Sequence, residues 1–329
     1  MNHKIFNYRA VVDFVEIEVI FEQATQACHV SRLVRPALSV TALDPRTNEP
    51  FPAAQSNTNT TVFRVRVQDP TSHAHLMNWV QVFRERASQW AGPAVSDMQR
   101  ITAIEIAFDV YAKPGKASRH DLARAVAYLY RTAPTVQGEK NHRLYREEGE
   151  GTGIPCDPES LARAFDGPEV TKGFNVGIGD KHADHYQHFY IKDTDSIVEP
   201  ETGKTDRCTL PVAEHRARFE NRWRGRELAD LIGEHLTDLE GFKFASLAKD
   251  YCSFRRADPT VQGLAKALLK ARRQIGERMS PEVLIRRHDG ARRRKIPYVY
   301  LPGTRADAEL NKHARNALER LTKAWARAA

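Results

Sequence analysis

The stretch ITAIEIAFDVY, residues 101–111, predicts a β-strand with two unlike faces. Side chains alternate across a pleated strand, so the isoleucines and the phenylalanine of its second half share one face. Glu105 and Asp109 fall on the other face, about 13 Å apart along the strand. A strand of this kind belongs to a sheet with one face packed on a core and the other face polar. We therefore expect a sheet whose polar face carries carboxylates.

Three further segments show the same two-residue alternation. They are VDFVEIEVIFE (12–22), TVFRVRVQD (61–69) and HRARFENRW (215–223). Helical patterns lie between or after the strands, over 69–90, 118–133 and 224–241. Interleaved strands and helices indicate an α/β or α+β sheet, and the polar strand faces indicate that helices cover one side alone. We predict an α+β fold: a mostly antiparallel sheet with helices on one face and an open, charged opposite face.

The C-terminal part of the chain is basic and helical in pattern. The whole sequence has 50 Lys+Arg against 42 Asp+Glu, a formal net charge of +8, and the excess gathers after residue 241. Amphipathic patterns over 258–280 and 307–325 predict two helices. We divide the chain into a domain over 1–240 and a basic helical region over 241–329 that binds nucleic acid, with a merely solubilising surface as the alternative. The arginines expected to contact phosphate there are Arg272, Arg273, Arg292, Arg293 and Arg294.

The composition excludes several other classes. No run of about 18 apolar residues predicts a membrane span, and the acidic residues near the N-terminus argue against a secretory signal. The four cysteines are far apart and form no CxxC pair, so neither a zinc module nor a disulfide framework is indicated. We expect a cytoplasmic protein without a membrane partner.

The stretch HYQHFYIKDTD, residues 185–195, predicts a strand with an unusual polar face. Alternation places on this face four side chains that can bind phosphate or move a proton. They are Tyr186, His188, Tyr190 and Lys192. A solvent-facing strand of a structural sheet more often carries Thr, Lys and Glu, so this strand is a candidate active-site strand, with ordinary exposed sheet residues as the alternative.

The strand predicted over 215–223 has a matching polar face. Phe219 and Trp223 are expected to face the core, and the opposite face carries one carboxylate among guanidinium groups. Its members are Arg216, Arg218, Glu220 and Arg222, and the three arginines are expected to bind phosphate. If these strands are neighbours, one sheet face combines arginines with carboxylate oxygens, which suit Mg²⁺ or Mn²⁺.

Three motifs carry a resemblance to a known family. GFNVGIGDKHADHYQHFYIKD (173–193), ITAIEIAFD (101–109) and RARFENRWRG (216–225) resemble, in the same order, motifs of the Rep_trans-type rolling-circle replication initiation factors of plasmids, filamentous phages and integrative elements. In that family a glycine-containing turn leads into a strand patterned R-x-Y-x-K. Gly177 and Gly179 match the turn, and Tyr190 and Lys192 match the end of the strand. His188 stands where the family favours Arg.

The resemblance implies a function and a set of residue roles. It implies a metal-dependent enzyme that nicks one DNA strand at an origin, forms a 5′-phosphotyrosyl bond and frees a 3′-hydroxyl primer. Tyr190 would be the nucleophile, with Tyr186 in reserve, and His188 and Lys192 would assist at the phosphate. Asp109, Glu220 and Glu105 would hold Mg²⁺ or Mn²⁺. Origin DNA, a second copy of the chain, and a host helicase and polymerase are the implied partners.

Two other functions stay open at this point. A relaxase for conjugative mobilisation would use the same chemistry on a transfer origin, and a non-catalytic DNA-binding regulator would use the basic helices alone. Other metal motifs are not favoured. His182, His185 and His188 divide between the two faces of a strand, and His73 and His75 lie at the start of a predicted helix. The glycine-rich stretches lack the Lys-Ser/Thr of a nucleotide-binding loop.

Overall fold

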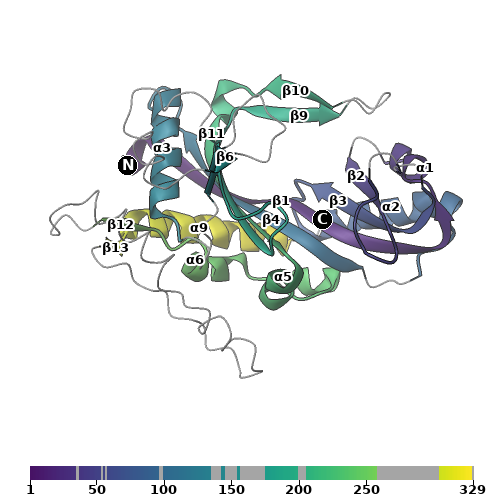
Figure 1. Cartoon of the computed structure of the whole chain (residues 1–329). Helices are drawn as coiled ribbons and strands as arrows, with labels where there is room; N and C mark the ends of the chain where they lie inside the picture. The colour runs from purple at the N-terminus through teal and green to yellow at the C-terminus, as the bar shows by residue number, and fades with distance from the viewer. Residues whose placement is uncertain are drawn as a thin grey trace.

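The structure is a computed structural model in which one large antiparallel sheet organises the chain (Figure 1). It describes residues 1–34, 37–52, 55, 58–95, 99–134, 142–144, 154–155, 175–198, 205–257 and 304–327. The 9-stranded sheet has the order β2-β3-β1-β4-β11-β8-β7-β5-β6, and all its neighbouring strands are antiparallel. The predicted α+β class is confirmed.

The strands of the large sheet are β1 (Phe6–Thr25), β2 (Leu38–Leu43), β3 (Thr60–Gln68), β4 (Arg100–Ala112), β5 (His142–Leu144), β6 (Ile154–Pro155), β7 (Asn175–Ile178), β8 (His185–Lys192) and β11 (Arg216–Arg224). Strands β9 (Thr194–Val198) and β10 (Thr205–Thr209) form a separate hairpin, and β12 (Arg255–Ala257) pairs with β13 (Thr304–Ala306). All four strand segments expected from alternation are present.

The helices are α1 (Ala27–Arg32), α2 (His73–Ala91), α3 (Arg119–Thr132), α5 (Gly225–Leu231), α6 (Leu247–Asp250) and α9 (Ala308–Trp325). Short 3-10 turns are η1 (His3–Ile5), η4 (Val212–Glu214), η5 (Leu236–Leu239) and η6 (Phe244–Ser246). Ser72 caps α2 and Ser118 caps α3 through side-chain hydrogen bonds, which confirms the predicted helix starts. Within the described residues, no helix is long and apolar enough to cross a membrane.

The helix predicted over 224–241 is shorter than its pattern suggests. It begins directly after β11, as expected, but α5 ends at Leu231 and the chain continues through the turn η5. Gly233 adopts φ of +130°, a left-handed conformation that other residues rarely adopt. A β-carbon at this position would lie 2.2 Å from Asp238 Oδ2, so the tight turn requires glycine and the helix cannot run through it.

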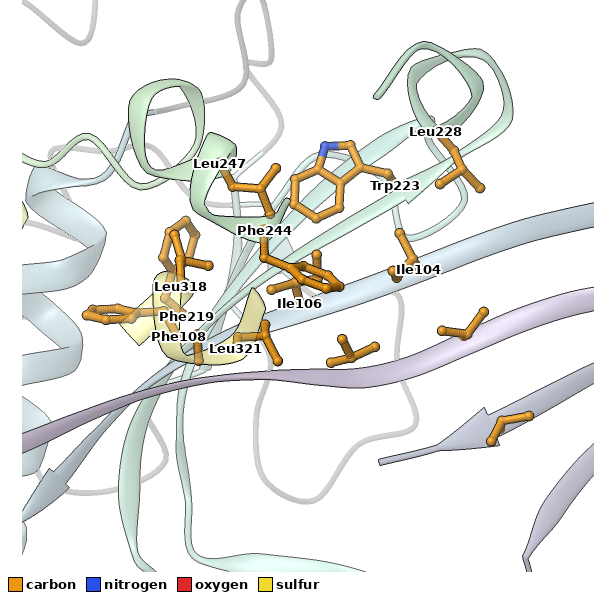
Figure 2. Packing of buried hydrophobic residues seen from close by; sticks show 14 of the residues in the cluster. Ile104, Ile106, Phe108, Phe219, Trp223, Leu228, Phe244, Leu247, Leu318 and Leu321 are labelled. Atoms are coloured by element: carbon orange, nitrogen blue, oxygen red, sulfur yellow. The ribbon is translucent and has the colours of Figure 1, made fainter. Parts of the chain in front are cut away.

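The core lies on one face of the sheet, under the helices. Ile104, Ile106 and Phe108 of β4 face this core, as predicted, and so do Phe219 and Trp223 of β11. Figure 2 shows these side chains meeting residues from α5, η6, α6 and α9. Apolar side chains removed from water on this scale supply the main driving force for folding.

Helix α9 is part of this core. Its predicted apolar stripe is buried, and the Trp325 indole N–H donates to the Leu239 carbonyl at 2.9 Å. The described part of the region after residue 241 therefore packs on the sheet. The division of function at that boundary stays a prediction, and the helix expected over 258–280 lies outside the described residues.

The N-terminal half of β1 pairs on one side. Strand β4 pairs with β1 from Phe6 to Glu18, whereas β3 pairs with the opposite edge of β1 only from Phe14 onward. Among the described strands, none lies beside the other edge of residues 6–13. Arg320 of α9 donates to the Tyr8 carbonyl at 2.8 Å on that edge.

The stability of the protein in acid should depend on His185. Its ring stacks on Trp223 at 5.2 Å on the core face, and burial lowers the pKa of the ring to about 4 despite a hydrogen bond to Asn221. The unfolded chain takes up this proton near pH 6.5, whereas the folded chain does not until about pH 4. The free energy of unfolding should therefore fall as the pH drops from about 6.5 to 4, by about 3 kcal/mol from this residue.

Urea unfolding of the wild type and of His185→Gln over this pH range measures the contribution. The variant should lose less stability on acidification, because its side chain does not titrate. Parallel losses in the two proteins would contradict the assignment.

Candidate active site

The polar face of the sheet brings together the three strands that carry the predicted site residues. β11 lies between β4 and β8, and its register places residues of the two neighbours directly opposite one another. Arg218 is opposite both Asp109 and Tyr190, and Glu220 is opposite His188. Paired positions bring side chains on one face within about 5 Å of each other. The predicted neighbourhood of these strands is confirmed.

Tyr190 is hydrogen-bonded to the carboxylate of Glu220. Its hydroxyl donates to Oε1 at 2.6 Å, and His188 Nδ1 lies 3.2 Å from Oε2 of the same carboxylate. The other ring nitrogen of His188 has a short hydrogen bond to Asn175 Oδ1 on β7. The rings of His188 and Tyr190 are 4.5 Å apart. Glu220, on the central strand, therefore contacts two of the three predicted catalytic residues, Tyr190 and His188.

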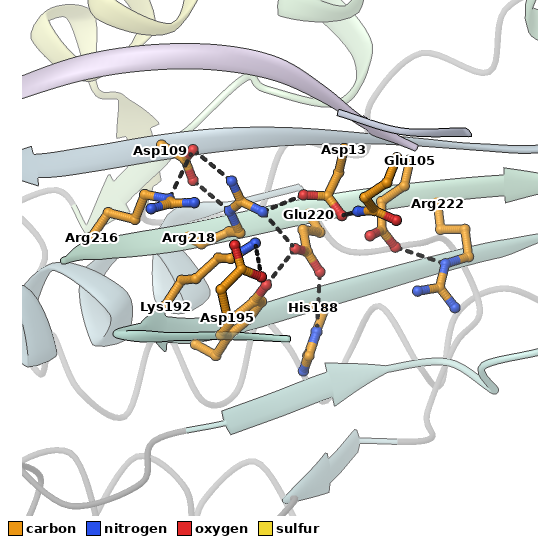
Figure 3. Close-up of polar contacts among 12 residues, drawn as sticks. Asp13, Glu105, Asp109, His188, Lys192, Asp195, Arg216, Arg218, Glu220 and Arg222 are labelled. Carbon is orange, nitrogen blue, oxygen red and sulfur yellow. Dashed lines mark hydrogen bonds and ion pairs between the residues drawn. The ribbon is translucent and has the colours of Figure 1, made fainter. Parts of the chain in front are cut away.

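Three carboxylates, including the Glu220 to which Tyr190 donates, gather on the polar face. Figure 3 shows Asp13, Glu105 and Glu220 near one another. One oxygen each of Asp13, Glu105 and Glu220 lies within 4.8 Å of the others. We call these residues the carboxylate group; all three are buried. An all-oxygen donor set of three carboxylates fits Mg²⁺ or Mn²⁺, the ions expected from the sequence.

Asp13 is the member of the carboxylate group that sequence reasoning missed. It lies in β1, where the pairing with β4 shifts between Val12 and Phe14, so that β1 has an extra residue there. Such a bulge redirects side chains, and here Asp13 and Phe14 both reach the polar face. The sequence carries a signal for this bulge. The apolar residues that alternate fall on even numbers up to Val12 and on odd numbers from Val15.

Asp109 is not at the position predicted for it. Arg218 separates Asp109 from the carboxylate group, because its Nε and Nη2 donate to the two oxygens of Asp109 at 2.7 and 2.8 Å. Its Nη1 donates to Asp13 and lies 3.4 Å from Glu220 Oε1 (Figure 3). Asp109 is also 3.3 Å from Arg216 Nε. Asp109 therefore does not join Glu105 and Glu220 as expected. It lies on the other side of Arg218, where it is ion-paired with Arg218 and Arg216.

The predicted DNA-binding arginines of β11 are paired with acids in this structure. Arg218 is 1% exposed, and Arg222 donates through Nε to Glu105 Oε2 at 2.7 Å. The guanidinium of Arg222 also lies over the rings of Phe14 and Tyr186. The polar face is therefore charged, as expected, but its central groups are less accessible than their sequence pattern suggests. The arginines of β11 are covered because side chains of the neighbouring strands, such as Asp109, Glu105 and Phe14, pack against them.

The electrostatics of the site oppose ionisation of the phenol. Desolvation first, and then the Glu220 carboxylate, raise the pKa of Tyr190 well above its usual 10. Burial also works against ionisation of Glu220, but the hydrogen bond and charge of His188, with Arg218, bring the pKa of this carboxyl below its ordinary value. Burial and the charge of Glu220 raise the pKa of Glu105 well above 4.5. Glu220 is thus an ionised acceptor facing a protonated Tyr190.

The remaining predicted residues lie at the margin of the site or outside the described chain. Lys192 Nζ is 3.5 Å from Asp195 Oδ1, at the end of β8. His185 faces the core and His188 the polar face, which confirms that these histidines divide between faces. The five arginines expected to contact DNA between residues 272 and 294 lie outside the described residues.

Comparison with known proteins gives little additional information. No protein-family model matches the chain, and the search of curated proteins gives no significant match. Among solved structures, one similar chain is a rolling circle replication initiator protein from Geobacillus stearothermophilus. It is 11% identical, and the alignment covers 82% of this chain and 96% of that chain with a TM-score of 0.31. A TM-score this low supports no inference about function.

Replacing Arg218 should destabilise the fold strongly. Arg218→Met keeps much of the side-chain volume but leaves the buried Asp13, Asp109 and Glu220 without their shared cation. Breaking a buried ion pair from one side costs about 3–5 kcal/mol. Chemical denaturation measures this loss, with Arg46→Ala as the matched control, because Arg46 pairs with Asp44 on the surface and is 88% exposed. A loss no larger than that of the control would contradict the role given to Arg218.

Proposed function

We propose that the chain is a metal-dependent DNA nicking and joining enzyme that initiates rolling-circle replication, with Tyr190 as nucleophile. One observation carries the proposal. The Tyr190 hydroxyl is hydrogen-bonded to Glu220, which is itself a member of the carboxylate group. A phosphodiester is an anion, so cleavage needs a positioned attacking oxygen and positive charge at the phosphate. The first is supplied by Tyr190, and the carboxylate group beside it could hold a cation for the second, in strands that carry the motifs described above.

Accessibility favours Tyr190 over Tyr186. Tyr186 shares the polar face but is 1% exposed, whereas Tyr190 is half-buried. A nucleophile must reach a phosphate bound from outside the protein, so the buried phenol is the poorer candidate. The hydrogen bond to Glu220 also orients the oxygen of Tyr190.

The carboxylate group is proposed to hold Mg²⁺ or Mn²⁺. Asp13, Glu105 and Glu220 would supply the protein ligands, with Arg218 and Arg222 limiting the repulsion among them. When bound, the ion would neutralise charge on the phosphate and favour the phenolate form of Tyr190. The protein alone does neither, since it raises the pKa of that phenol.

The proposed reaction exchanges one phosphate ester for another. The Tyr190 oxygen attacks phosphorus, forms the new O–P bond and breaks the bond to the 3′-oxygen of the neighbouring nucleotide. The phenolic proton passes to Glu220, its hydrogen-bond acceptor, and from there to the leaving 3′-oxygen, so the number of protons is unchanged. The 5′-phosphotyrosyl ester conserves the energy of the broken bond, so rejoining needs no ATP.

Other parts of the chain are proposed to hold the DNA. Lys192 follows Tyr190 by two residues on the same strand face, where its ammonium could contact a phosphate. The basic region over 241–329 is proposed to bind the duplex at the origin through phosphate contacts. A second copy of the chain and a host helicase and polymerase would complete initiation.

Tyr190→Phe should abolish covalent attachment to DNA. The change removes one oxygen and little volume, so folding and DNA binding should persist while the adduct falls below detection. Denaturing gels of protein incubated with Mg²⁺ and supercoiled DNA carrying the cognate genetic element reveal the adduct. Tyr186→Phe is the matched control and should keep it. Phosphotyrosine mapped to Tyr186 would move the nucleophile, and no adduct from the wild type would favour a non-catalytic DNA-binding regulator.

Asp13 and Asp109 both pair with Arg218, but replacing them should have different effects on the Mn²⁺ concentration that nicking requires. Asp13→Asn removes a charge from the carboxylate group and should raise the Mn²⁺ concentration for half-maximal nicking by at least about tenfold. Asp109→Asn should lower stability while leaving that concentration unchanged, because Asp109 lies on the other side of the guanidinium. Nicking measured over a Mn²⁺ series separates the two. Full activity of Asp13→Asn in EDTA would rule out this site.

A further inference from the structure

We propose that the chain has a second metal site, for Zn²⁺, formed by His3, Glu309 and His313. One possible ligand atom from each of these residues lies within 4.8 Å of the others. The site joins the N-terminal turn η1 to the first turns of α9, on the helix-covered side of the sheet. The proposal is independent of the proposed nicking activity, because no residue of the carboxylate group takes part.

Helix α9 presents two of the ligands on one face. Glu309 and His313 are four residues apart, a spacing that places side chains one above the other on a helix. Glu309 Oε1 and His313 Nε2 are 4.0 Å apart. The start of α9 is fixed by Asp307, whose side chain accepts a hydrogen bond from the Leu310 N–H. The helix therefore holds a carboxylate and an imidazole ready to share one ion.

The third ligand comes from the other end of the chain. His3 is buried, and its ring stacks on that of His313 with centroids 5.7 Å apart. Tyr8 lies against both histidines: its ring stacks on His313 at 4.2 Å, and its hydroxyl is 2.7 Å from His3 Nδ1. Tyr8 thus fixes the orientation of both imidazoles, as residues behind metal ligands commonly do.

The hydrogen bond of Tyr8 also decides which nitrogen of His3 can bind a metal. Nδ1 is engaged by the Tyr8 hydroxyl, which leaves Nε2 for the ion. A metal on Nε2 places the ring proton on Nδ1, and that N–H then donates to the Tyr8 oxygen. This is the arrangement in which a second partner fixes the tautomer of a liganding histidine.

The donor set selects the metal class. Two imidazoles and one carboxylate with an open fourth position are typical of zinc, whereas Mg²⁺ prefers oxygen donors alone. Ligands at about 2.0–2.2 Å from zinc lie about 3.3 Å apart in a tetrahedral site. Glu309, which is exposed, can rotate to shorten its 4.0 Å separation from His313, and small movements of the imidazoles would complete the approach. All three residues line a cavity of about 1000 Å³, so the fourth position can hold water.

Metal analysis of the full-length protein tests the proposal. Metal-depleted protein is dialysed against Zn²⁺ in excess Mg²⁺, so that sites made of oxygen donors alone are already filled. The wild type should bind a Zn²⁺ equivalent and gain thermal stability with Zn²⁺ concentration. Glu309→Gln, whose side chain is exposed, should fold normally and lose both effects. Co²⁺ in place of Zn²⁺ should give tetrahedral visible absorption in the wild type and not in this variant.

Three more variants make the result specific. His313→Gln should also lose Zn²⁺, and Tyr8→Phe, which keeps all three ligands, should bind it about tenfold more weakly. His120→Gln, at an exposed histidine of α3, is the matched control and should bind as the wild type does. Equal uptake by the wild type and Glu309→Gln, or loss of uptake in His120→Gln, would overturn the proposal.

Discussion

A single buried guanidinium joins the strands on which the site is built. Arg218 of β11 bonds to Asp109 of β4 and to Asp13 of β1, and it lies beside Glu220 of its own strand. Charges removed from water are costly unless each is paired, so the position of every acid around Arg218 is constrained by the others. The arrangement places three carboxylates within reach of one ion while the sheet stays closed around them.

The same network sets the chemical state of the phenol. Glu220 is ionised because His188 and Arg218 stabilise its charge, and that charge in turn keeps the proton on Tyr190. The protein therefore supplies position and orientation but not the positive charge that a phenolate requires. Under the proposed function, the phenol would therefore stay protonated until a cation and a phosphate arrive together.

Most of the fold followed from local pattern. Alternation in β4 and β11 assigned their core and polar faces correctly, and the stripe of α9 identified its buried side. What local pattern could not supply was pairing between distant strands. The bulge at Asp13 changes which residue reaches the site, and Arg218 can pair with Asp109 because β11 lies next to β4. Burial of the acids likewise depends on partners from neighbouring strands, and the early end of α5 depends on one backbone angle at Gly233.

Among the described strands, none pairs with the outer edge of residues 6–12 of β1, and this gives α9 a role beyond packing. A strand with free N–H and C=O groups is a template on which another chain can add a strand. Here Arg320 occupies the Tyr8 carbonyl, and a guanidinium at an edge discourages a second backbone from approaching. A chain that lost α9 would expose a strand containing Phe6, Tyr8 and Val12 together with its open hydrogen-bonding edge. By this argument the C-terminal helix would limit pairing of the N-terminal strand with a second chain.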